Sequence, residues 1–152
     1  MSNYHNTSNS ISVILKNHRQ EIELSVKGYE VSVPIKSYWD NNWLIFSCRL
    51  REDDRSMYGE FPCFMTMELQ RLKMLLEQYQ SGGLPAVSWN GTEPNFAVYL
   101  YPNFRLKIYF YAETDSWEMT FQKYAEPGDV ETLIGFCSDS LKQYPVRDIG
   151  IR

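Results

Sequence analysis

The sequence predicts an α+β fold, a two-layer sandwich of a mostly antiparallel sheet with two helices on one face. Three observations support this prediction. Segments whose apolar residues recur at every second position alternate along the chain with two segments whose apolar residues recur every three or four positions. The connections between these segments are short, which favours antiparallel pairing of consecutive strands. Each expected strand has one apolar face and each expected helix has one apolar stripe, so both helices are expected on the same side of the sheet.

The size and composition of the chain fit one domain that spans residues 1–152. Of its 152 residues, 43% are hydrophobic and 15% are aromatic, which is enough to fill a core. The polar N-terminal segment MSNYHNTSNS lacks the apolar region of a signal peptide. The longest apolar run is far shorter than the roughly 18 residues of a membrane-spanning helix. We therefore expect a cytoplasmic protein with no membrane partner.

The first half of the chain predicts strands separated by polar turns. Residues 1–18 are mostly polar and predict either a frayed arm or an edge strand. Two strands with alternating apolar residues follow, over 21–31 and over 43–51. The charged segment 52–55 is expected to turn the chain into a returning strand at 56–61, which makes a hairpin. The core-facing residues of the first two strands are expected to be Ile22, Leu24, Val26, Leu44, Phe46, Cys48 and Leu50.

A helix is predicted over 66–80. Thr66 is a suitable N-cap residue, and Glu68 is placed to meet the positive end of the helix dipole. The segment 81–83, Ser-Gly-Gly, is typical of a helix end. The apolar stripe of this helix consists of Leu69, Leu72, Leu76 and Tyr79.

The second half of the chain predicts a three-stranded meander followed by a closing helix. The strands are expected near 96–101, 104–111 and 117–122, with the strongest two-residue period in the chain. The helix is expected over 129–143, with Asp129 as its N-cap. The core residues of the meander are expected to be Phe96, Val98, Leu100, Phe104, Leu106, Ile108, Phe110, Trp117, Met119 and Phe121. Those of the helix are Val130, Leu133, Ile134, Cys137, Leu141 and Tyr144.

The outward face of the meander is rich in tyrosine. Eleven tyrosines are many for a chain of this length, and tyrosine is favoured both in strands and at protein interfaces. A row of exposed tyrosines flanked by charge is unusual for a bare solvent face. We expect either the N-terminal arm or a bound partner to cover it. Its residues are Tyr99, Tyr101, Tyr109 and Tyr111, with Arg105, Lys107, Glu118 and Gln122.

The sequence offers no catalytic, cofactor-binding or metal-binding residues, so we expect that the chain is not an enzyme. Its two histidines, His5 and His18, both lie in the polar N-terminal segment. There is no CxxC pair and no P-loop. The odd number of cysteines, each in an apolar context, indicates reduced and buried thiols. They are Cys48, Cys63 and Cys137.

The net charge of −4 is concentrated in one segment. Residues 113–139 contain seven acidic residues and one lysine, a net charge of −6, which leaves +2 for the rest of the chain. This segment is either a solvated face or a patch that attracts a basic partner. Nucleic acid is not an expected ligand, because phosphate binding requires clustered lysine and arginine.

Short motifs occur at three places in the chain. The first is the polar turn 40–42, Asp-Asn-Asn, which leads into a strand through Trp43 and Leu44. The second is Pro62-Cys63 followed by Thr-x-Glu-Leu at 66–69, and the third is Pro-Val-Arg at 145–147. Together they resemble the WapI-type immunity proteins of bacteria, whose pattern has Asp-Asn-Trp-Leu, whereas this chain has one additional asparagine. Members of this family are small cytosolic proteins that bind and silence a polymorphic toxin domain.

The resemblance implies an immunity protein that neutralises a cognate toxin domain, and many toxins of this class are basic nucleases. The contact is expected on the tyrosine face and the acidic segment beside it. The expected toxin-binding residues are Tyr99, Tyr101, Tyr109, Tyr111, Glu113, Asp115 and Glu118. The alternative is a domain that binds a small molecule on the tyrosine face or in the loop of Trp39 and Trp43. A small-molecule site would be an enclosed apolar cavity, whereas an inhibitor needs a flat or mildly concave charged surface.

Overall fold

The computed structural model describes residues 10–31, 38–93, 95–112 and 117–147. In chain order its elements are β1 (Ile11–Lys16), β2 (Gln20–Tyr29), α2 (Tyr38–Asn41), β3 (Trp43–Glu52), β4 (Arg55–Met65), α3 (Thr66–Gln80), β5 (Val87–Asn90), β6 (Phe96–Leu100), β7 (Arg105–Ala112), β8 (Trp117–Tyr124) and α4 (Pro127–Gln143). The expected α+β class, with antiparallel strands and two long helices, is confirmed.

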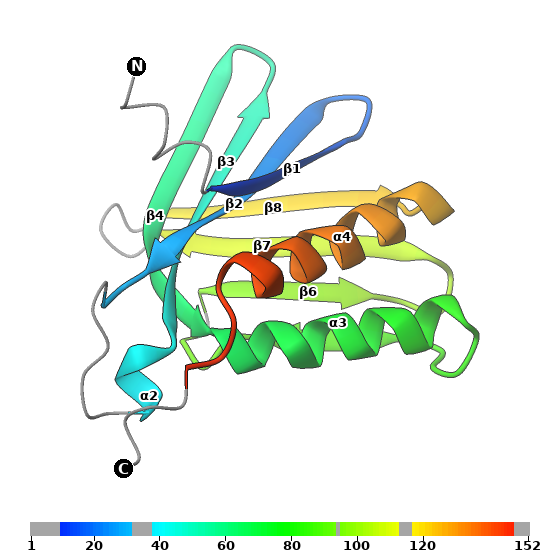
Figure 1. Ribbon diagram of the computed structural model, residues 1–152. Coiled ribbons are helices and arrows are strands. Elements are labelled where there is room, and N and C mark those ends of the chain that lie inside the picture. Colours follow the sequence, from blue (N-terminus) through cyan, green and yellow to red (C-terminus); the bar gives the residue numbers. More distant parts are fainter. Residues whose placement is uncertain (1–9, 32–37, 94, 113–116, 148–152) are drawn as a thin grey trace, which may run out of the picture.

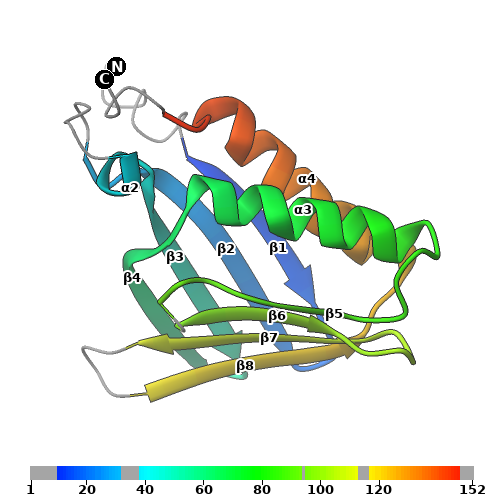
Figure 2. The ribbon, with the colours of Figure 1, turned by 90° about the horizontal axis from the view of Figure 1, so that it is seen from below.

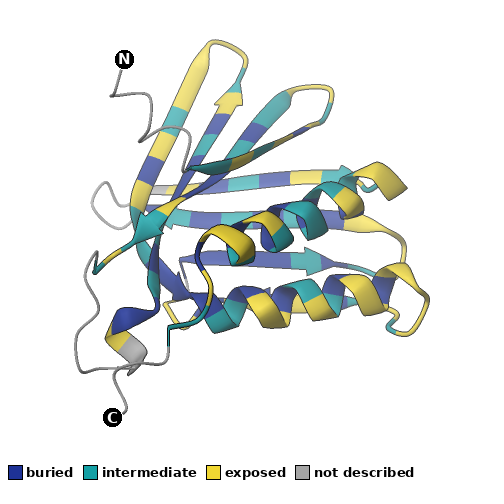
Figure 3. Cartoon of the chain, viewed as in Figure 1, coloured by how far each residue is buried: buried dark blue, intermediate teal, exposed yellow. Residues whose placement is uncertain are grey.

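The strands form two antiparallel sheets instead of the one sheet that the sequence suggested. The first has the order β1-β2-β3-β4 and the second the order β5-β6-β7-β8. The strands of the two sheets run in different directions, and the long helices α3 and α4 lie side by side on the same face of the second sheet (Figures 1 and 2). Both helices turn their exposed positions away from the sheets (Figure 3). Within the described part of the chain, no helix is long and apolar enough to cross a membrane.

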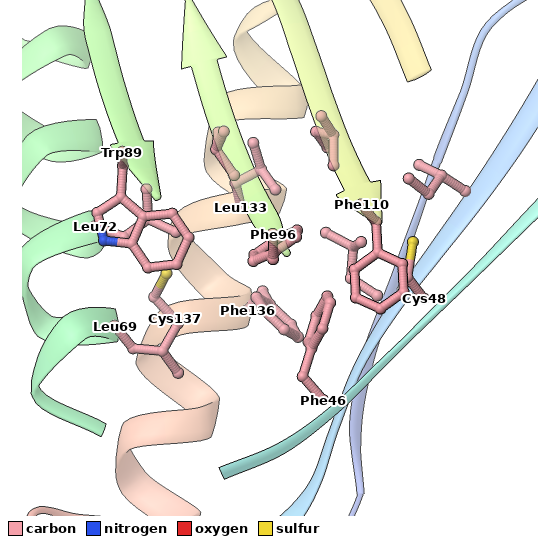
Figure 4. Close-up of a cluster of buried hydrophobic side chains, with 14 of the residues drawn as sticks. Phe46, Cys48, Leu69, Leu72, Trp89, Phe96, Phe110, Leu133, Phe136 and Cys137 are labelled. Carbon is pink, nitrogen blue, oxygen red and sulfur yellow. The ribbon is translucent and has the colours of Figure 1, made fainter. Parts of the chain in front are cut away.

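Aromatic rings join the two sheets and the last helix in one core. Phe46 on β3 is fully buried, and its ring centroid lies 4.3 Å from that of Phe96 on β6 and 5.6 Å from that of Phe110 on β7. It also contacts Phe64 at 5.1 Å and Phe136 on α4 at 6.5 Å. These rings meet at the centre of the core (Figure 4). Aromatic pairs at such distances add stability beyond the apolar area they bury.

The hairpin of β1 and β2 binds the free edge of the second sheet. The amide of Asn17 donates to the backbone carbonyl of Gln122 at 2.6 Å, and the amide of Gln20 donates to that of Thr120 at 3.1 Å. Both carbonyls belong to the edge strand β8. The side chains thus occupy acceptors that would otherwise be open to pairing with another strand. They also fix the angle between the two sheets.

The strands and long helix of the first half agree with the sequence prediction, apart from the helix cap, the short helix α2 in place of a turn, and β4, which extends to Met65. Of the two alternatives for the N-terminal segment, residues 11–16 form an edge strand, while residues 1–9 lie outside the described residues. The N-cap of α3 is Met65, because β4 runs directly into the helix. The N–H of Met65 donates to the carboxylate of Glu68 at 2.8 Å. Thr66 is instead a buried helical residue whose N–H and hydroxyl both donate to the carbonyl of Asn42, at 2.9 Å and 3.3 Å.

The second half departs from the prediction in four respects. The short strand β5 was missed, because four residues are too few to establish a period. Phe104 does not face the core: it lies in the turn between β6 and β7 and is 59% exposed. The N-cap of α4 is Glu126, and Asp129 accepts a hydrogen bond from its N–H at 2.8 Å. The helix stripe also includes Phe136, which is buried. The side chain of Trp117 lies outside the described residues.

The predicted burial of the three cysteines is confirmed. Cys48, Cys63 and Cys137 are free and fully buried. Burial raises the pKa of all three thiols, in the case of Cys137 to about 12. Thiols that remain protonated and inaccessible are inert packing residues.

Substitution of Gly59 by alanine should destabilise the junction of β4 and β7. A Cβ atom at this position would lie 2.5 Å from Cε2 of Phe110 and 3.3 Å from the Cβ of Ala112. Because Phe110 is fully buried and cannot move aside freely, we expect a loss of about 1–3 kcal/mol in the free energy of unfolding, measured by urea denaturation. Gly135→Ala on α4 is the matched control. Nothing lies within 4 Å of its new Cβ, so it should stabilise the helix by up to about 1 kcal/mol. Equal effects of the two substitutions would contradict this packing.

Candidate binding surface

The outer face of the second sheet is formed by residues whose neighbours along each strand point into the core. Tyr99 on β6 and both Tyr109 and Tyr111 on β7 alternate with buried residues, and each is half-buried. Tyr101 follows β6 and is also half-buried. The described elements lie on the helix side of this sheet, and none of them covers its other face (Figure 2).

Two cations lie against the tyrosine rings. The guanidinium carbon of Arg105 is 4.9 Å from the ring centroid of Tyr101, and Nζ of Lys107 is 5.9 Å from that of Tyr99. Strand register produces the second pair, because Tyr99 and Lys107 are directly opposite each other. Contacts of this kind hold both a flexible cation and an aromatic ring in place.

The other end of this face is acidic. Tyr111 lies opposite Glu118 in the register of β7 and β8. Burial, the charge of Glu118 and a hydrogen bond to its carboxylate raise the pKa of the Tyr109 phenol. Tyr109 therefore remains a protonated donor, held by Glu118, at neutral pH. The face combines a basic and aromatic end with an acidic and aromatic end.

The structure divides the described part of the acidic segment between two surfaces. Glu118 is exposed on the outer face of the second sheet. Asp129, Glu131 and Asp139 belong to α4, on the other side of the sheet. Asp129 is also engaged in an ion pair of 2.9 Å with Lys123. Glu113 and Asp115, two of the expected toxin-binding residues, lie outside the described residues.

The motifs at 40–42 and 145–147 meet in the structure. The side chain of Asn42 is fully buried and makes two hydrogen bonds to the backbone of Arg147: its amide donates to the carbonyl at 2.8 Å, and its oxygen accepts from the N–H at 2.7 Å. The guanidinium of Arg147 lies 3.4 Å from the ring centroid of Tyr29 and donates to the carbonyl of Val31 at 2.7 Å. The hydroxyl of Tyr29 donates to the carbonyl of Pro145 at 2.5 Å.

These contacts form a clasp, made of Tyr29, Asn42, Pro145 and Arg147, that fastens the C-terminal segment to the start of β3. Asn41 and Asn42 in the segment 40–42 are buried, and Trp43, one of the two tryptophans of the predicted ligand loop, is half-buried. The side chain of Trp39 lies outside the described residues. The motifs that carry the family resemblance therefore hold the fold together.

The cavities among the described residues lie elsewhere on the molecule, and two of them are next to the long helices. One of about 520 Å³ lies between α3 and α4 and is lined by Lys73, Met74 and Leu141 among others. A second, of about 290 Å³, lies beside the turn between β6 and β7 and is lined by Tyr79, Phe104 and Val130 among others. Neither cavity is lined by the outward tyrosines, where the small-molecule alternative placed its ligand. The described residues contain no group of three or more histidine, cysteine, aspartate or glutamate side chains that could hold a metal ion.

Comparison with known proteins gives one match. The model of the immunity protein WapI-like family matches residues 13–145, which include both β-sheets, both long helices and Pro145 of the clasp. No curated protein and no solved structure matches the chain.

Replacement of Asn42 by alanine should weaken the clasp. The substitution removes both hydrogen bonds to the backbone of Arg147 at a buried site, so we expect the free energy of unfolding to fall by about 1–3 kcal/mol. Asn42→Asp keeps the acceptor and loses the donor. We expect its loss of stability to be no smaller than that of Asn42→Ala, because it also buries a charge. Thermal or urea unfolding measures both. A stability equal to that of the wild type in Asn42→Ala would contradict the proposed role of the clasp.

Proposed function

Because the chain belongs to the immunity protein WapI-like family, we propose that it binds and neutralises a cognate polymorphic toxin domain in the bacterial cytoplasm. Its role is that of an inhibitor that acts by binding and not by catalysis. An inhibitor of this kind needs a rigid scaffold and an exposed surface complementary to the toxin. The toxin-binding surface is proposed to be the outer face of the second sheet.

The observation that carries this assignment is the arrangement of half-buried tyrosines on a rigid sheet. The opposite side of the same strands is fixed in the core, since Val98, Ile108 and Phe110 are fully buried. Tyrosine offers a large contact area with few rotatable bonds, and hot spots of protein interfaces are enriched in it. The Tyr109–Glu118 pair and the stacked cations reduce the ordering cost of binding further. The toxin-binding residues proposed are Tyr99, Tyr101, Tyr109, Tyr111, Glu113, Asp115 and Glu118.

The toxin is proposed to be a basic protein, a nuclease. The net charge of −4 and the acidic segment 113–139 support this part of the proposal. A basic toxin would be attracted over a distance of about 8 Å at physiological ionic strength, so charge would act mainly on the association rate. An inhibitor seated on a nuclease would also exclude its nucleic acid substrate.

The proposal is tested with the toxin domain encoded beside the gene of this chain. Co-expression of the two should restore growth to cells that the toxin domain alone kills, and the purified pair should form a complex in size-exclusion chromatography. The association rate should fall as the salt concentration rises from about 50 to 500 mM. Failure to protect and failure to bind would together refute the immunity function. Protection with a rate that does not depend on salt would refute only the basic partner.

Tyr109→Ala is expected to weaken toxin binding while leaving the fold intact. Truncation of a hot-spot tyrosine costs about 2 kcal/mol or more, equivalent to roughly a 30-fold rise in the dissociation constant. Tyr58→Ala is the matched control, because Tyr58 lies on the first sheet with Arg49 stacked on its ring at 4.6 Å. Binding is measured by calorimetry and stability by the melting temperature. A large drop in melting temperature without loss of affinity would mean that Tyr109 only packs.

A further inference from the structure

The two most exposed aromatic side chains in the described part of the chain lie at the end of the second sheet where β7 begins and β8 ends. Tyr124 is 68% exposed and Phe104 is 59% exposed. They are adjacent, because the N–H of Ala125 donates to the carbonyl of Phe104 at 2.7 Å and Arg105 is the register partner of Tyr124. We call Phe104, Arg105 and Tyr124 the aromatic corner. Exposed aromatic rings grouped around an arginine are typical of interface hot spots.

The backbone of Phe104 is in an unfavourable conformation. Its φ of 65° is in the left-handed region, which is unfavourable for a bulky residue. The N–H of Phe104 donates to the carbonyl of Tyr101, and the N–H of Tyr101 donates to the carbonyl of Arg105. These bonds enclose a turn with Pro102 in its second position, and glycine is the residue favoured where Phe104 stands. Folding gains little from this phenylalanine, because most of its ring remains in solvent.

A cavity lies directly beside the aromatic corner. Its volume is about 290 Å³, and five of its lining residues are apolar or aromatic: Tyr79, Phe104, Ala125, Pro127 and Val130. The ring of Phe104 meets the ring of Tyr79 edge-on, at 5.9 Å between centroids, and so forms one wall. An open apolar cavity of this size can receive an apolar side chain from a partner.

The outer face beside the aromatic corner carries two cations, Arg105 and Lys107, whereas the exposed Glu126 lines the cavity on the helix side. In the parts of the chain that the structure describes, neither Arg105 nor Lys107 forms an ion pair, whereas Arg19, Arg51 and Lys123 do. Both cations are held by tyrosine rings instead, Arg105 by Tyr101 and Lys107 by Tyr99. A cation held in position without a carboxylate is complementary to a carboxylate of a partner.

We propose that the aromatic corner is the anchor of the toxin interface, and this inference rests on the immunity function proposed above. The corner would receive an apolar side chain of the toxin in the cavity on the helix side, while a toxin carboxylate on the outer face of the sheet pairs with Arg105 and Lys107. The anchor therefore recognises a local acidic and apolar feature, whatever the net charge of the toxin. Single-stranded nucleic acid also stacks on aromatic rings beside cations. A protein is the better occupant, because the tyrosine rings at 99 and 101 are already covered by the cations and the exposed Glu126 lines the cavity.

Phe104→Gly separates folding from binding, because glycine relieves the left-handed conformation and removes the ring. We expect this variant to keep or raise the melting temperature and to bind the toxin domain encoded beside this gene about tenfold more weakly or worse. Arg105→Glu is a second variant, which reverses the charge and should weaken binding by a similar factor. Arg49→Glu is its matched control: Arg49 also stacks on a tyrosine, but on the first sheet, so its affinity should equal that of the wild type.

Each outcome bears on the anchor. If the wild type binds the toxin and both Phe104→Gly and Arg105→Glu bind it with the same affinity, the anchor is overturned. The immunity function is then left intact. A wild type that fails to bind the toxin would overturn the immunity function and the anchor with it. A labelled oligothymidine of about 12 nucleotides tests the other occupant. Suppose that the wild type binds the oligothymidine, and that both variants lose this binding but still bind the toxin. The corner is then a nucleic acid site and not the toxin anchor.

Discussion

The packing of phenylalanine rings around Phe46 is the contact on which the rest of the structure depends. It fixes the inner faces of both sheets and of α4 against one another. Because side chains along a strand alternate in direction, a fixed inner face also fixes the outer face. With Ile108 and Phe110 held in the core, Tyr109 and Tyr111 must point outward. The core thus determines where the tyrosine surface lies without any contact between that surface and the core rings.

The residues of the clasp and the residues proposed to contact the toxin are different sets. Asn42 and Arg147 lie in the clasp, where a buried amide satisfies backbone groups at the C-terminal segment. The tyrosine face and the aromatic corner lie on the second sheet, away from the clasp (Figure 1). Polar residues in a buried motif specify a fold, because leaving them unpaired is costly. A scaffold held by such contacts can be retained while an exposed sheet face is adapted to a particular partner.

The sequence predicts this fold well wherever a period extends over several residues. The stripe of α3 and the alternation of β2, β3 and β7 are examples, since burial of one face imposes a repeat that can be read locally. The division into two sheets is not predictable in this way, because it depends on which strands pair. Phe104 fits the two-residue period of β7, but the turn rotates it outward. The tyrosine face was predicted from the same alternation, whereas Tyr124 and the neighbouring cavity require the packing of α4 against the sheet.

Stability and recognition are separable at the aromatic corner. Tertiary packing stabilises most residues that depart from local preference, as it does the buried Asn41 and Asn42. Phe104 has less compensation: its backbone conformation is unfavourable and its ring, apart from an edge contact with Tyr79, is largely exposed. A residue that is costly for the free protein is retained when it contributes in a complex, because strain at a ligand contact is offset by binding. The same reasoning applies to Arg105 and Lys107, whose charges are held by tyrosine rings in place of carboxylates. The second sheet therefore has a core surface on one side and, on the other, the surface proposed to bind the partner.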